Sequence, residues 1–83
     1  MNTMLPPGPV YTPGEVLALL DPIDDIRSGL YVVHSLMDGW AVLRGVVDQE
    51  ETETLWVTDD HVRLPVRALD LFMPVGIHLR APS

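Results

Sequence analysis

Two apolar runs that alternate with polar positions meet at Asp38 and Gly39, and they give the clearest structural signal in the chain. Asp-Gly between such runs is typical of a two-residue hairpin turn, because both central residues of a type I′ turn need a positive φ. We therefore predict a β-hairpin over residues 30–47. This turn pairs Met37 with Trp40 and fixes the partner of every residue further out.

Side chains alternate along a strand, so this register divides the hairpin into two faces. One face is almost wholly aliphatic and is assigned to the core: Leu30, Val32, His34, Leu36, Ala41, Leu43, Gly45 and Val47. The other face is amphipathic and is expected to be half exposed: Tyr31, Val33, Ser35, Met37, Trp40, Val42, Arg44 and Val46. A slip of one residue would exchange the two faces, so the assignment depends on the turn type.

The chain before the hairpin contains one ambiguous element. Residues 15–20 form a continuous apolar run after Pro13-Gly14, which suits a strand buried on both sides. The alternative is a short helix, with Thr12 as its N-cap and Pro22 ending it. We prefer the strand, since isolated helices of that length are marginal.

Two segments flank this element. Residues 1–10 contain three prolines and are expected to form an extended arm. Residues 21–29 are expected to form a polar loop that Ile23 and Ile26 anchor to the body of the protein.

After the hairpin, residues 48–53 form a charged connection and residues 54–58 the next predicted strand, with Trp56 outside and its neighbours Leu55 and Val57 facing the core. Asp59-Asp60-His61 is expected to begin a turn. Residues 66–72 are expected to form a closing strand, with a helical turn over 66–69 as the alternative.

Five short strands at close spacing indicate a small antiparallel barrel. This organisation resembles the SH3-like barrel superfold. The resemblance implies an all-β, five-stranded, SH3-like antiparallel barrel over residues 11–72, with a Pro-rich arm over 1–10 and a short C-terminal strand or tail over 73–83. The segments that carry it are Pro13-Gly14-Glu15-Val16, Gly29-Leu30-Tyr31-Val32-Val33, Asp38-Gly39-Trp40-Ala41-Val42-Leu43, and Leu55-Trp56-Val57 through Leu64-Pro65. The resemblance is topological and leaves the function open.

Composition and charge exclude several kinds of site and partner. The 83 residues allow one small domain, and the chain has no cysteine, which excludes disulfides and thiolate metal sites. The formal net charge is −7, with no lysine, so phosphate backbones repel the chain and direct nucleic-acid binding is not expected. No signal peptide and no membrane-spanning run is evident, and a cytoplasmic location is expected.

Catalytic and metal-binding patterns are weak. His34, His61 and His78 do not follow a metal-ligand spacing, and His61 beside two carboxylates is the best local cluster. No serine lies in a nucleophile-elbow context. We therefore expect a protein that is not an enzyme and that has no catalytic residues, no cofactor and no metal.

The aromatic residues carry the leading hypothesis. Tyr31, Trp40 and Trp56, beside Arg44, are predicted to share an outer face that binds a protein partner or a second copy of the chain. The alternative uses the carboxylates instead: an acidic surface that imitates nucleic acid and inhibits a DNA-binding protein.

Overall fold

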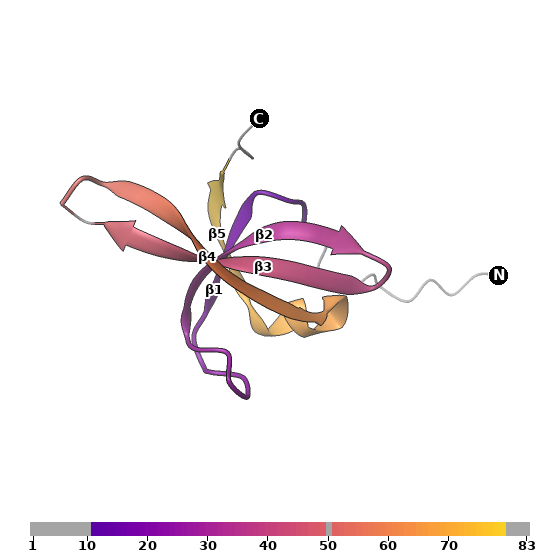
Figure 1. The fold of residues 1–83 in the computed structure, drawn as a ribbon. Helices are drawn as coiled ribbons and strands as arrows, with labels where there is room; N and C mark the ends of the chain where they lie inside the picture. Colours follow the sequence, from indigo (N-terminus) through magenta and orange to yellow (C-terminus); the bar gives the residue numbers. More distant parts are fainter. Residues whose placement is uncertain (1–10, 50, 80–83) are drawn as a thin grey trace.

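The computed structural model describes residues 11–49 and 51–79, which form one antiparallel sheet of five strands (Figure 1). The strand order is β4-β3-β2-β1-β5, which makes β4 and β5 the two edges. A short 3₁₀ helix, η1, lies between the last two strands. The elements are β1 (Glu15–Leu19), β2 (Gly29–Met37), β3 (Trp40–Gln49), β4 (Thr54–Pro65), η1 (Val66–Leu71) and β5 (Met73–His78).

The all-β expectation is confirmed, and so is the strand over residues 15–20. β1 has apolar side chains buried on both faces: Leu17 and Leu19 pack in the larger core, whereas Val16 packs in a second cluster on the opposite side. Successive side chains of a strand point to opposite faces of the sheet, so a strand between two apolar clusters buries both its odd-numbered and its even-numbered residues. The edge strands are not paired with each other in the described part of the chain, so the sheet bends strongly without closing into a barrel.

The Asp38-Gly39 turn is confirmed, with φ angles of 53° and 80° that match the type I′ geometry. The register is as predicted next to the turn, where Met37 pairs with Trp40 and Ser35 with Val42. It then slips by one residue at His34, which has no partner in β3. This single extra residue is a β-bulge. Because of it, residues 30–33 of β2 point to the opposite faces of the sheet from those that the predicted register assigns to them.

The bulge corrects part of the predicted face assignment. Val33 pairs with Leu43, and both side chains point into the larger core with Tyr31. His34 and Val47, which the sequence pattern assigned to the core, are exposed. Val32 is buried, but in the cluster on the opposite side of the sheet.

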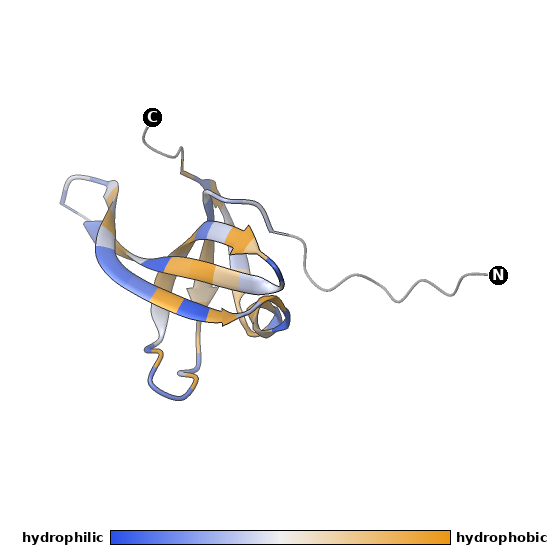
Figure 2. Ribbon diagram, turned by 45° about the vertical axis from the view of Figure 1, so that its right-hand side comes forward, coloured by the Kyte–Doolittle hydropathy of each residue, from blue (hydrophilic) through white to orange (hydrophobic). Residues whose placement is uncertain are grey.

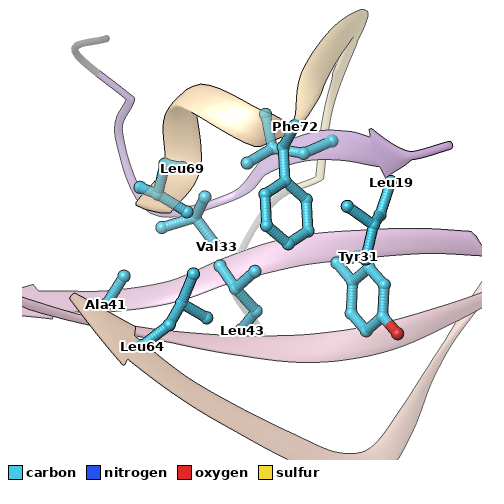
Figure 3. Packing of buried hydrophobic residues seen from close by; sticks show 9 residues of the cluster. Leu19, Tyr31, Val33, Ala41, Leu43, Leu64, Leu69 and Phe72 are labelled. Carbon is cyan, nitrogen blue, oxygen red and sulfur yellow. The ribbon is translucent and has the colours of Figure 1, made fainter. Parts of the chain in front are cut away.

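The larger core lies between the sheet and η1. Figure 3 shows Leu69 and Phe72 above the sheet, facing the side chains of β2, β3 and β4. The rings of Tyr31 and Phe72 meet edge to face, with centroids 5.8 Å apart. The buried members are Leu17, Leu19, Tyr31, Val33, Ala41, Leu43, Leu64, Leu69 and Phe72.

Residues 66–72 are not the closing strand. Val66, Leu69 and Phe72 recur every three residues, which is the repeat of a 3₁₀ helix, and all three side chains contact the core. The helical turn given as the alternative is therefore the correct one, extended to Leu71. The last strand is β5, which pairs with β1, so residues 73–78 belong to the sheet.

The turn predicted at Asp59-Asp60-His61 is also wrong, because these residues lie inside β4, which is 12 residues long. Three residues of β4, 58–60, lie opposite Gly45 alone, and the strand changes direction there. Gly45 leaves the room for this bulge, since a Cβ atom at this position would lie 2.8 Å from Oγ1 of Thr58.

The loop between β1 and β2 is polar, as expected, and Ile23 and Ile26 pair with each other and contact the larger core. The predicted arm over residues 1–10 lies outside the described residues. Across the part of the chain that the structure describes, no helix is long and apolar enough to span a membrane.

Gly14 holds three segments together, which leads to the first prediction. Its N–H donates to the carbonyl of Val33, its carbonyl accepts from Leu79, and its φ is +97°. A Cβ atom there would overlap the Leu79 carbonyl oxygen. We expect Gly14→Ala to lower the free energy of unfolding by about 1–3 kcal/mol, measured by urea denaturation.

The matched control is Gly39→Asn, at a turn position with positive φ and open space around it. Asparagine tolerates this conformation, so the control should cost only about 0.5 kcal/mol. Equal effects of the two substitutions would contradict the packing role of Gly14.

Candidate interaction surface

Tyr31, the first of the predicted surface residues, belongs to the core instead. Its side chain is 8 % exposed, and its hydroxyl donates to the carbonyl of Arg27 at 2.5 Å. Burial raises the pKa of the Tyr31 phenol above its ordinary value; nearby Arg27 lowers it and Asp60 raises it. The phenol therefore links the β1–β2 loop to the sheet.

Trp40 lies at the start of β3 and is 42 % exposed. The guanidinium carbon of Arg63 lies 4.4 Å from the centre of its ring, the geometry of a cation–π contact. One face of the indole is thus already covered by a cation of the same chain. Met37, its cross-strand partner, is exposed beside it.

Arg44 is occupied by the bulge in β4. Its Nε donates to the carbonyl of Thr58 at 3.0 Å, and its Nη2 lies 3.3 Å from the carboxylate of Asp59. Alternation along β3 puts Arg44 on the same face as Trp40. These contacts stabilise the bulge in β4.

Trp56 lies on the other face. It pairs with Val47, which alternation puts on the face of Leu43 and Gly45, opposite Trp40 and Arg44. The predicted common face of Tyr31, Trp40 and Trp56 is therefore wrong as geometry: one ring is in the core and the two indoles lie on opposite faces. Their binding of a partner stays a prediction.

Trp56 lies in a part of the sheet that projects from the other strands. Pairing between β2 and β3 ends at Leu30 and Val46, so the ends of β3 and β4 pair only with each other. This projecting hairpin, residues 47–49 and 51–57, is called the β3–β4 tip below, and Figure 1 shows its two strands extending away from the other strands. Trp56 is 58 % exposed, and Val47 and Val57 beside it are also exposed.

Two threonines order the indole of Trp56. Its Nε1 donates to Oγ1 of Thr54 at 3.1 Å, and Oγ1 of Thr54 lies 2.6 Å from Oγ1 of Thr52. The backbone N–H of Thr52 in turn donates to the carbonyl of Gln49. The polar atom of the indole thus has a hydrogen-bond partner within the chain, while more than half of the residue is exposed to water.

The sequence indicates one of these two contacts. Thr54 and Trp56 are two residues apart in β4, and this spacing places their side chains in one row of the strand, whereas Thr52 lies in the turn before it. The tip is also acidic: residues 47–57 of the sequence include four Asp and Glu residues and no Arg or Lys. Figure 2 shows the hydrophilic colouring of the turn that joins β3 to β4.

Two open grooves flank the β1–β2 loop, with volumes of about 450 and 490 Å³. Asp25, Ile26 and His61 border both of them, and Ser28 lines the first. No group of three or more His, Cys, Asp or Glu side chains is gathered for a metal ion in the described ranges.

No protein-family model, no curated protein and no solved structure matches this chain.

The buried phenol of Tyr31 generates a pH prediction. Because its pKa is raised in the folded state, its stabilising contribution is full below pH 10.0, the ordinary pKa, and is lost as pH rises through the folded-state pKa. Tyr31→Phe removes the hydrogen bond to Arg27 and should cost about 1 kcal/mol at neutral pH. The stability gap between wild type and variant should narrow in urea titrations above pH 10.0; a constant gap would contradict the assignment.

The hydrogen bond between Trp56 and Thr54 predicts how freely the indole moves. In a Trp40→Phe background, Trp56 is the only tryptophan of the chain. Thr54→Val removes the acceptor of the indole N–H, so time-resolved fluorescence anisotropy should show faster and wider local motion of the ring. Thr12→Val, at an exposed position before β1, is the matched control and should leave the anisotropy decay unchanged.

Proposed function

We propose that this chain is a non-catalytic interaction module that binds a protein partner through Trp56 and the apolar side chains around it on the β3–β4 tip. The observation that carries the proposal is an exposed indole that the chain itself holds in place. Tryptophan is a frequent anchor of protein interfaces. Fixing its rotamer before binding removes part of the entropy cost of association, which favours an interface role over a chance exposure.

The arrangement of the strands supports an SH3-like fold for this module. The order β4-β3-β2-β1-β5, with a 3₁₀ helix between β4 and β5, agrees with that superfold. A binding role inferred from this fold is an analogy, and the exposed Trp56 supports that role independently.

The charge of the tip favours a basic partner. Asp48, Glu51 and Glu53 surround the turn and are all exposed. A second copy would bring the same carboxylates close together, and like charges across an interface are unfavourable. A partner with arginine or lysine around an apolar pocket would complement both the charge and the indole.

The proposal predicts that replacing Trp56 weakens partner binding far more than replacing Trp40. Tagged wild-type chain is used to capture partners from an extract of the source cell, and the purified partner is then titrated by calorimetry. We expect Trp56→Ala to weaken binding by about 30-fold or more, as at interface anchors. Trp40→Ala, whose ring is on the opposite face, should stay within about threefold.

The same titration addresses the acidic-mimic alternative, which the six carboxylates between Arg44 and Arg63 favour. A nucleic-acid mimic would bind a DNA-binding protein with a steep loss of affinity in salt and with little effect of Trp56→Ala. The interaction module requires the opposite result, a large effect of Trp56→Ala and a shallow salt dependence. Light scattering of the chain alone tests for self-association.

A further inference from the structure

Two of the three histidines lie close together at a place where both strands are irregular. His34 is the bulged residue of β2, and His61 follows residues 58–60 of β4, which lie opposite Gly45 alone. Their ring centroids are 5.8 Å apart and their planes are at 87°. Both side chains are exposed, so a solute can reach them. Neither bulge is required by the hairpin turn, and together they bring the imidazoles of non-adjacent strands into contact.

The ring of His61 has a defined orientation. Its Nδ1 lies 2.8 Å from the backbone carbonyl oxygen of Asp59. A carbonyl oxygen only accepts hydrogen bonds, so in the neutral ring Nδ1 carries the proton and Nε2 carries the lone pair. This is the arrangement that metal-binding histidines have, since the hydrogen bond of one ring nitrogen fixes the tautomer and leaves the other nitrogen as the ligand.

The rings are close to the separation that a shared ion requires. Two imidazoles on one tetrahedral zinc ion, with Zn–N distances of about 2.0–2.1 Å, have ring centroids roughly 5 Å apart. The observed separation is 5.8 Å, so a small movement of one ring toward the other brings both within reach of one ion. Among the described residues, neither ring nitrogen of His34 has a hydrogen-bond partner, so a rotation of this side chain toward the ion changes its edge-to-face contact with His61 but breaks no hydrogen bond.

The charges around the pair permit a cation. Arg44 is the cross-strand partner of His61, but its guanidinium is turned to the Asp59 carboxylate and the Thr58 carbonyl. This ion pair compensates the positive charge next to the site. Asp60 is a further carboxylate in the same bulge, and the whole chain has a net charge of −7.

We propose that His34 and His61 form a two-histidine site for a divalent late transition metal of the zinc type. Imidazole nitrogen suits Zn²⁺, Ni²⁺ and Cu²⁺, whereas Mg²⁺ and Ca²⁺ prefer oxygen ligands. Two protein ligands leave the remaining positions of the ion to water or to a ligand from another molecule. The site is independent of Trp56, which lies further out on the tip.

The chain supplies its own control, because His78 on β5 is the third exposed histidine and lies on the opposite edge strand. Zn²⁺ alone is titrated into the full chain by calorimetry, and Ni²⁺ and Mg²⁺ are titrated in parallel. The variants are His34→Ala, His61→Ala and His78→Ala. Proton–nitrogen spectra of the histidine rings report the tautomer of His61 without metal and the nitrogens that shift with it.

We expect one Zn²⁺ or Ni²⁺ per chain and no binding of Mg²⁺. His34→Ala and His61→Ala should each weaken Zn²⁺ binding by at least about tenfold, since loss of a ligand exceeds the loss of an outer-shell partner. His78→Ala should leave the affinity unchanged, and the Nε2 signal of His61 should shift on binding. A failure of wild type to bind, a loss confined to one of the two histidines, or an equal loss in His78→Ala would overturn the proposal.

Discussion

The extra residue at His34 is the constraint on which the rest of the structure depends. It has no partner in β3, so the two halves of β2 present opposite rows of side chains to the core. Because of it, Tyr31 and Val33 point toward Phe72 and Leu69, and η1 has an apolar surface to pack on. The same residue leaves Val32 to join Val16 and Val46 on the other side, so one bulge supplies both clusters.

The features of this fold that depend on residues close together in the chain could be predicted from the sequence. The Asp38-Gly39 turn was predictable because few dipeptides accept two positive φ angles in succession, and β1 because its apolar run is too short and too continuous for a helix. The anchoring of the β1–β2 loop was predictable from two isoleucines in a polar segment. These features depend on neighbours in the chain, and local patterns report such features well.

The features that depend on contacts between residues far apart in the chain could not be predicted in the same way. A bulge at His34 leaves the alternation of apolar residues almost intact, since Leu30, Tyr31, Val32 and Val33 are apolar in either register. The extra residues of β4 are polar and looked like a turn, because only their contact with Gly45 and Arg44 keeps them in the strand. The exposure of Trp40 and Trp56 followed from the pattern, but their placement on opposite faces required the register of β4.

Both margins of the sheet are irregular. Residues 58–60 of β4 lie opposite one residue of β3, and residues 75–77 of β5 lie opposite Val16 alone. Pro74 has no N–H to offer, and Gly76 has a φ of +78°. A foreign strand laid along either margin would find its ladder interrupted, which disfavours edge-to-edge pairing with another chain although β5 carries exposed apolar side chains.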